Sequence, residues 1–250
     1  LHPGFGGMET VDESHSEVLV RAGAGENWDK FVDWCVSRGY HGTENLSLIP
    51  GSVGSAPVQN IGAYGREARE IIQEVEVFDL ATQTLRRLSN QECEFGYRDS
   101  IFKHGEPNRF IIISVWFRLL KKSPFMLDYG NVREEFEKKD IQSLQTLRQT
   151  IIEIRENKLP DPELIGNAGS FFKNPVVEEQ TYQQIKAKYP RIPGYPLPGN
   201  KMKIPAAWLI DQSGWKGVRE GDVGTWPMQP LVIVNYGNAS GKEIFVFSEK

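Results

Sequence analysis

The stretch IPGSVGSAPVQNIGAYG, residues 49–65, combines four glycines with the polar side chains Gln59, Asn60 and Tyr64. Glycine allows main-chain N–H groups to approach a ligand closely, and the three polar side chains can fix a flat heterocycle. No GK[ST] follows, so the stretch is not a nucleoside-triphosphate P-loop, and it lacks the G-x-G-x-x-G pattern of dinucleotide-binding turns. It therefore predicts either a ligand-binding loop or an ordinary structural loop.

Apolar patterns on both sides of this stretch predict strands and helices in alternation. Strands are predicted over residues 16–23, 71–80, 84–88, 110–120 and 231–235. Helices are predicted over residues 28–38 with Asn27 as the cap, over 143–157, 178–189 and 204–212, and after Ser240. A proline-rich loop is predicted over residues 190–200. Alternating strands and helices with hairpins among them indicate the α+β class.

The composition is that of a folded chain with one or two domains, since domains average about 150 residues and this chain has 250. A hydrophobic share of 39% excludes a disordered chain. The net charge of −4 gives no general attraction to nucleic acid, and no apolar run is long enough to span a bilayer. The isolated thiols Cys35 and Cys93 are expected to be small core residues of a cytosolic protein, and the scattered histidines predict no metal site.

The stretch EFGYRDSIFK, residues 94–103, places Arg98 among aromatic residues. A partly buried guanidinium is a natural bidentate clamp for a carboxylate. A surface ion pair between Arg98 and Asp99 is the alternative.

The stretch GNAGSFFKNP, residues 166–175, places Ser170 between small residues and a phenylalanine pair. It has no G-x-S-x-G elbow and no matching His/Asp pair, which argues against a Ser-His-Asp hydrolase. The alternative is a turn followed by a strand that carries the two phenylalanines.

Together these motifs resemble the UDP-N-acetylenolpyruvoylglucosamine reductase family, in particular its type I branch. Its flavin-domain motifs resemble GAGENW (23–28), residues 49–54 and residues 59–65, and its catalytic motifs resemble residues 96–103 and 166–175. AWLIDQ (207–212), with Lys216 and Gly217, resembles its substrate domain, and LDYG (127–130) resembles its tyrosine loop.

The resemblance implies a vanillyl-alcohol-oxidase (PCMH) type FAD-binding domain, present in part, followed by an α+β substrate-binding domain. The first is expected over residues 1–147, as the second lobe and the linker, and the second over residues 148–250. The family's first glycine-rich phosphate loop has no counterpart before Gly23, and its final strand, which carries a catalytic glutamate, has none before the chain ends. We therefore expect a chain that lacks both family termini. Trp226 stands where many members have a histidine.

The resemblance also implies an activity, the NADPH-driven, FAD-dependent reduction of UDP-N-acetylglucosamine enolpyruvate to UDP-N-acetylmuramate. That step serves peptidoglycan synthesis, and thereby cell wall biogenesis, cell shape and cell division, in the cytoplasm. Arg98 would stabilise charge on the substrate carboxylate, and Ser170 would donate a proton. Another flavin oxidoreductase of the same fold, or a non-catalytic nucleotide-sugar binder, remains an alternative.

The implied binding residues fall into two sets. Those for FAD are Pro50, Gly51, Ser55, Gln59, Asn60, Ile61, Gly62, Ala63 and Tyr64. Those for the substrate are Tyr97, Tyr129, Arg155, Lys158, Asn174, Tyr195, Lys216 and Gln229.

Overall fold

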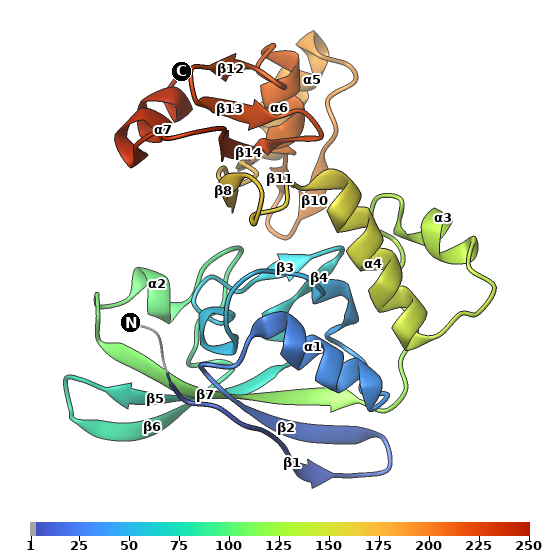
Figure 1. Ribbon diagram of the computed structural model, residues 1–250, viewed down its shortest axis with the longest axis vertical. Helices are drawn as coiled ribbons and strands as arrows, with labels where there is room; N and C mark the ends of the chain where they lie inside the picture. Colours follow the sequence, from blue (N-terminus) through green and yellow to red (C-terminus); the bar gives the residue numbers. More distant parts are fainter. Residues whose placement is uncertain (1–3) are drawn as a thin grey trace. The chain divides into compact units, whose positions relative to one another are not determined.

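The computed structural model describes residues 4–250, apart from the side chain of Ala168. The chain divides into two compact units, the first ending at Ile154 and the second running from Arg155 to Lys250. This division falls within the helix α4 (Leu144–Lys158), which also contains the boundary predicted after residue 147. Each unit has its own sheet and core, and Figure 1 shows the elements of both.

A five-stranded antiparallel sheet forms the base of the first unit. Its spatial order is β1 (Met8–Glu13), β2 (Glu17–Gly23), β7 (Phe110–Leu120), β5 (Ile72–Asp79) and β6 (Thr84–Ser89). The long apolar strand β7 lies at the centre, as its Ile/Val/Phe content favours. The edge strand β1 was not predicted, because nearly all of its residues are exposed and it has no apolar alternation.

Helix α1 (Trp28–Ser37) lies across one face of this sheet (Figure 1). Its start was correctly predicted, since the Asn27 side chain accepts a hydrogen bond from the Lys30 amide at 3.0 Å. Phe31 projects onto Phe117 of β7 with ring centroids 4.5 Å apart. The buried aromatic cluster therefore joins the helix to the centre of the sheet.

Shorter elements complete the first unit. They are β3 (Gly62–Ala63), β4 (Arg66–Glu67), α2 (Ile101–His104), α3 (Val132–Glu137) and the 3₁₀ turns Glu44–Leu46, Val53–Ser55 and Ala68–Glu70. Phe136 of α3 packs with Leu147 and Ile151 of α4 in a small second core. Helix α3 was not predicted, because its six residues are too few to show a helical period.

The buried carboxylate of Asp79 ends β5. It accepts hydrogen bonds from Arg109 Nε at 3.2 Å, Arg109 Nη2 at 3.0 Å and Arg86 Nη1 at 3.1 Å. These bonds, with Arg109 foremost, lower the pKa of Asp79 to about 2. The ionised carboxylate therefore holds the hairpin of β5 and β6 to the start of β7.

We expect the stabilising effect of Asp79 to depend on pH. A folded-state pKa below the unfolded value near 3.9 makes this contribution complete above that value, and it is lost as the pH falls toward 2. Urea unfolding of the wild type and Asp79→Asn should show a constant stability difference above about pH 5 that narrows below about pH 4. The exposed Asp140→Asn is the matched control, and an equal pH trend in that variant would contradict the assignment.

The second unit contains two small antiparallel sheets and three helices. One sheet has the order β12 (Arg219–Glu220), β13 (Val223–Trp226), β14 (Gln229–Asn235) and β8 (Gly166–Ser170). The other has the order β10 (Tyr195–Leu197), β11 (Lys201–Lys203) and β9 (Val176–Glu178). The helices are α5 (Glu179–Lys188), α6 (Ala206–Gln212) and α7 (Gly241–Ser248).

Three expectations for the second unit need correction. The proline-rich segment 190–200 contains the strand β10, because its residues pair in register with β11. Helix α6 begins at Ala206 rather than at residue 204, since the ring of Pro205 disfavours a helical conformation at Ile204 and Pro205 itself is extended. In residues 166–175 the strand precedes the phenylalanine pair instead of containing it.

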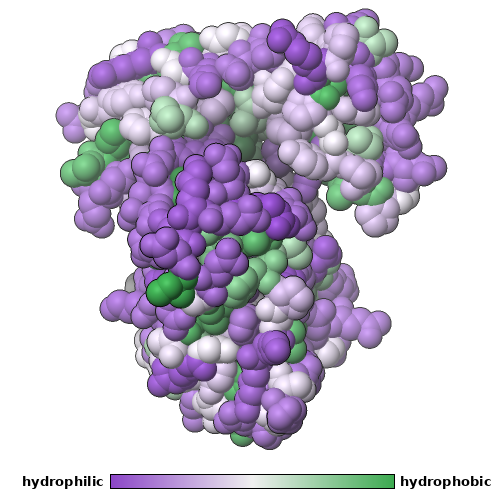
Figure 2. All heavy atoms as spheres, turned by 90° about the vertical axis from the view of Figure 1, so that its right-hand side faces the viewer, coloured by the Kyte–Doolittle hydropathy of each residue, from purple (hydrophilic) through white to green (hydrophobic). Residues whose placement is uncertain are grey.

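Both cysteines are free and buried, which confirms the prediction that they act as small core residues. Burial raises the pKa of the Cys93 thiol to about 12, so it stays protonated. Figure 2 shows one face of the molecule, where hydrophilic side chains dominate and hydrophobic residues form scattered patches. Within residues 4–250, every helix is too short or too polar to cross a lipid bilayer.

Candidate functional site

The glycine-rich stretch 49–65 is tied to the segment that leads into α1. Trp28 donates its amide to the Gly51 carbonyl at 3.0 Å, and the Gly54 amide donates to the Ala24 carbonyl at 2.9 Å. A Cβ atom on Gly54 would lie 2.7 Å from the Cβ of Ala24. Only glycine allows this close approach of two main chains, so Gly54 serves packing.

The predicted FAD-binding residues of the stretch differ in exposure. Pro50, Gly51, Ser55 and Gln59 are exposed, Gly62, Ala63 and Tyr64 are half-buried, and Asn60 and Ile61 are buried. Gly51, at φ +119°, and Tyr64, at φ +47°, turn the chain sharply. Residues 50–51 are thus exposed and residues 62–64 half-buried, and small residues with polar groups of this kind suit a flat heterocycle with polar edges such as the FAD isoalloxazine.

Asn60 faces the protein interior. Its Nδ2 donates to Glu67 Oε2 and to the Gly96 carbonyl, both at 2.9 Å, and its Oδ1 accepts from the Arg69 amide at 2.9 Å. Its side chain therefore joins the glycine-rich stretch to the Arg98 motif.

Arg98 lies against the glycine-rich stretch. Its Nη1 donates to the Asn60 carbonyl at 3.2 Å, its Nη2 donates to the Gly62 carbonyl, and its guanidinium lies 5.5 Å from the ring centre of Tyr97. A Cβ atom on Gly62 would lie 2.8 Å from Nη1. Glycine at position 62 therefore leaves room for the guanidinium beside residues 60–62.

Arg98 does not pair with the neighbouring Asp99. His104 takes that carboxylate, with Nδ1 3.3 Å from Asp99 Oδ2, and also reaches Glu94 Oε2 at 3.2 Å. The hydrogen bond to Glu94, followed by that to Asp99, raises the pKa of His104. Among residues 4–250 no carboxylate forms an ion pair with Arg98, so the alternative of a surface pair with Asp99 is wrong.

Two further side chains hold these segments. The buried Ser100 donates its hydroxyl to the Val58 carbonyl at 2.6 Å and caps α2 through the Phe102 amide. Asn45 Nδ2 donates to the carbonyls of Tyr64 and Met126, both at 2.9 Å. Asn45 and Ser100 were not predicted, since their partners are 19 to 81 positions away and no local spacing indicates them.

The predicted tyrosine loop, residues 127–130, contacts the end of the glycine-rich stretch. The ring of Tyr129 meets that of Tyr64 edge-on, with ring centres 5.9 Å apart. Gly65 lies beside it, because a Cβ atom there would be 3.7 Å from Tyr129 Cβ. The first unit thus brings together the glycine-rich stretch, the Arg98 motif and the tyrosine loop.

In the second unit, Ser170 is an exposed residue at the end of β8, opposite Val232 of β14. The preceding Gly169 has φ +69° and donates its amide to Asn167 Oδ1 at 3.0 Å. The strand register shifts here, which re-aims the residues that follow. Asn174 accepts the Ala206 amide at 2.9 Å, so its side-chain oxygen helps to begin α6.

The remaining predicted substrate residues lie near the ends of helices and strands or on the loops between them. Lys216 is exposed on a loop held to β13 by Thr225, whose amide donates to the Val218 carbonyl at 2.9 Å. Gln229 pairs with Trp226 across the β13–β14 turn, and Tyr195 is exposed on β10. Arg155 and Lys158 stand three positions apart in the last turn of α4 and share a face.

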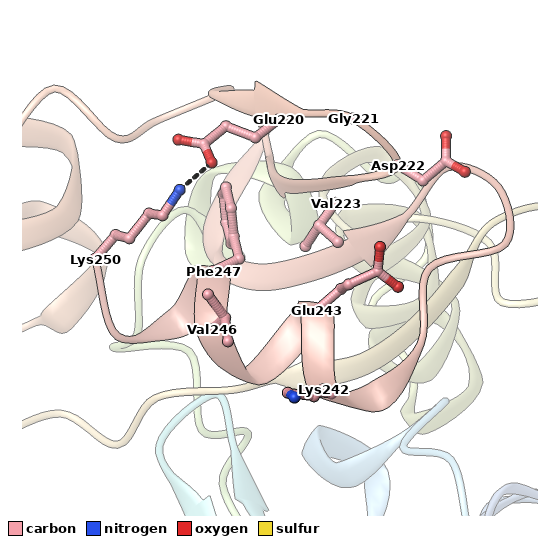
Figure 3. Close-up of a pocket in the computed structure, with 9 residues that line it drawn as sticks. All are labelled: Glu220, Gly221, Asp222, Val223, Lys242, Glu243, Val246, Phe247 and Lys250. Atoms are coloured by element: carbon pink, nitrogen blue, oxygen red, sulfur yellow. Dashed lines mark hydrogen bonds and ion pairs between the residues drawn. The ribbon is translucent and has the colours of Figure 1, made fainter.

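The second unit also has a hollow of about 310 Å³ between α7 and residues 220–223. Figure 3 shows Val246 and Phe247 of α7 among the residues that line it, and an ion pair of Lys250 with Glu220. No predicted site residue lines it, so it is separate from the positions discussed above.

Comparisons with known proteins match both units. A model of the FAD binding domain matches residues 4–89, and a model of the UDP-N-acetylenolpyruvoylglucosamine reductase C-terminal domain matches residues 161–250. A UDP-N-acetylenolpyruvoylglucosamine reductase of Bacteroides fragilis is 47% identical over all of this chain and 75% of its own length. The chain belongs to this family. A reductase of Pseudomonas aeruginosa is 46% identical over 98% of this chain and 72% of its own length.

A solved structure agrees. The crystal structure of UDP-N-acetylenolpyruvylglucosamine reductase from Thermus caldophilus superposes with a TM-score of 0.63 and 27% identity. The match covers 92% of this chain, which spans 66% of the crystallised reductase chain. These matches confirm the predicted family, the fold class, the oxidoreductase class, the family's function and FAD with NADPH as its redox partners.

Proposed function

We propose that this chain reduces UDP-N-acetylglucosamine enolpyruvate to UDP-N-acetylmuramate, with NADPH as the source of electrons. The proposal is supported by family membership and by the convergence of three family motifs in the first unit. Two buried, reduced thiols and a nucleotide-sugar substrate favour a cytoplasmic location.

The FAD-binding residues proposed from the sequence are retained with divided roles. Pro50, Gly51, Ser55 and Gln59 would offer exposed groups, and residues 62–64 would offer half-buried main chain. Asn60 and Ile61, which are buried, would support the conformation of the loop. When bound, FAD supplies the hydride that originates from NADPH.

Arg98 is the residue whose geometry carries the proposal. An enol ether is electron-rich, so hydride reaches its C3 only if the charge pushed into the conjugated carboxylate is stabilised. Arg98 is held by two neutral carbonyl oxygens and keeps its full positive charge for such a group. This is electrostatic stabilisation of the oxyanion-hole type.

Ser170 is the proposed proton donor. After hydride has reached C3, the substrate enolate must gain a proton at C2, and an enolate is basic enough to take it from a hydroxyl. The exposed position of Ser170 after the turn at Gly169 leaves this hydroxyl accessible.

The substrate residues are proposed to divide by chemistry. Arg155, Lys158 and Lys216 suit the diphosphate, and the polar residues Tyr97, Tyr129, Asn174, Tyr195 and Gln229 suit the sugar, base and carboxylate edges.

The test is a two-step assay of the purified flavoprotein. Flavin absorbance should bleach with NADPH and return when the enolpyruvyl nucleotide is added without oxygen. Rapid return with oxygen and none with the nucleotide would instead favour an oxidase of the same fold. Binding of UDP-N-acetylglucosamine in calorimetry, with no flavin spectrum, would favour a non-catalytic nucleotide-sugar binder.

A further inference from the structure

Three hydrogen bonds from the first turn of α1 hold residues 46–51, which lead into the glycine-rich stretch 49–65, here called the FAD-binding loop. Trp28 Nε1 donates to the Leu46 carbonyl at 2.8 Å, and the Trp28 amide donates to the Gly51 carbonyl at 3.0 Å. Between them, the Leu48 amide donates to Asp29 Oδ1 at 2.5 Å. Residues 46–51 are thereby fixed from one side by two consecutive residues.

Leu48 is the one non-glycine residue of the segment 46–51 with a positive φ. Its φ of +56° lies in the left-handed region, which a leucine adopts rarely and keeps only where surrounding contacts impose it. It stands two positions before Pro50, the first exposed residue of the FAD-binding loop. The bond from its amide to Asp29 therefore holds Leu48 in this conformation just before Pro50.

Arg148 of α4 fixes the Asp29 carboxylate in turn. Its Nη1 lies 2.8 Å from Asp29 Oδ1 and its Nη2 lies 2.9 Å from Oδ2, a bidentate pair. The Arg148 side chain is only 11% exposed, and that of Asp29 is 25% exposed. Arg148 Nε also reaches Asp33 Oδ1 at 3.2 Å, but that carboxylate is 69% exposed. Bidentate, charge-assisted bonds of this kind are directional, so they set the orientation of the carboxylate.

We propose that Asp29 and Arg148 are positioning residues for the FAD-binding loop. The hydrogen bonds that link Arg148 to Asp29 and Asp29 to Leu48 set the conformation of the exposed residues Pro50 and Gly51. The inference rests on FAD being the cofactor. It assigns to these two residues an effect on FAD affinity although neither belongs to the glycine-rich stretch.

The test is titration of the flavin-depleted protein with FAD, in which the quenching of flavin fluorescence measures binding and gives the Kd. Asp29→Ala removes both the bond to Leu48 and the partner of Arg148, and should raise the Kd for FAD about tenfold or more. Asp29→Asn keeps an oxygen for the Leu48 amide but loses the charge, and should raise Kd about threefold. Arg148→Lys, which keeps the charge and loses the bidentate geometry, should behave like Asp29→Asn.

Asp33→Asn is the matched control, because it loses a carboxylate partner of Arg148 that does not contact the loop. Its Kd should stay within about twofold of the wild type. The thermal midpoint of the flavin-free protein separates a folding defect from a loop defect, since each variant should remain folded at the titration temperature even where breaking the partly buried pair lowers the midpoint below that of Asp33→Asn.

Wild-type Kd in Asp29→Asn and Arg148→Lys, or an equal rise in Asp33→Asn, would overturn the inference while leaving the FAD-dependent function intact. A wild-type protein that binds no FAD would overturn both.

Discussion

Replacing Arg98 by lysine should slow the oxidation of reduced flavin by the enolpyruvyl nucleotide about 10²–10³-fold, the usual cost of losing one preorganised donor to a developing oxyanion. Lysine keeps the charge but cannot span the Asn60 and Gly62 carbonyls with separate nitrogens while presenting a planar edge to a carboxylate. Stopped-flow absorbance of the flavin measures this step directly. Flavin reduction by NADPH should remain near the wild-type rate, since Arg98 is assigned to the other substrate.

The control for this prediction is Arg118→Lys. Arg118 belongs to the same unit but is paired with Glu17 at 2.9 Å, so its charge is already neutralised. It should leave both half-reactions unchanged. Equal slowing of the two half-reactions in Arg98→Lys would mean that Arg98 maintains the loop rather than stabilising the substrate carboxylate.

Replacing Ser170 by alanine should also slow substrate-dependent reoxidation, by about 10²–10⁴-fold, the range for the loss of a positioned acid. The change removes one hydroxyl from an exposed position at the end of β8, so the fold should be preserved. Reoxidation in deuterated solvent should be slowed in the wild type, because the proton that reaches C2 comes from an exchangeable group.

Ser248→Ala is the matched control in the same unit, since its hydroxyl donates to the Phe245 carbonyl within α7. It should show wild-type kinetics. Normal reoxidation of Ser170→Ala would remove Ser170 from the mechanism without affecting the role of Arg98, because the two variants are measured in the same assay.

The family of this protein was predictable from the sequence because its motifs are contiguous. Residues 49–65, 94–103 and 166–175 are each read within about ten to seventeen positions, and their order along the chain is itself specific. The strand β7 and the start of α1 were predictable for a similar reason. An apolar run and a side-chain cap express local preferences of the main chain that the tertiary structure did not override.

The partners of the motif residues were not predictable in this way. The sequence suggests that Asn60 is a ligand-binding amide, but its side chain forms hydrogen bonds with Glu67, Arg69 and Gly96. Arg98 looks like the partner of Asp99, but it binds carbonyl groups 36 and 38 positions away. A polar side chain takes whichever partner the packing of distant segments brings within about 3 Å.

The sequence by itself therefore determined the family, the α+β class and the residue types available for FAD and substrate. Only the tertiary structure decided which of those residues are exposed and which bind other parts of the protein. It also revealed the linked hydrogen bonds from Arg148 to Asp29 and from Asp29 to Leu48; Arg148 and Asp29 are 119 positions apart in the sequence. The physical reason is that hydrogen bonds and ion pairs are decided by distance in space, which sequence spacing encodes only within a single helix, strand or turn.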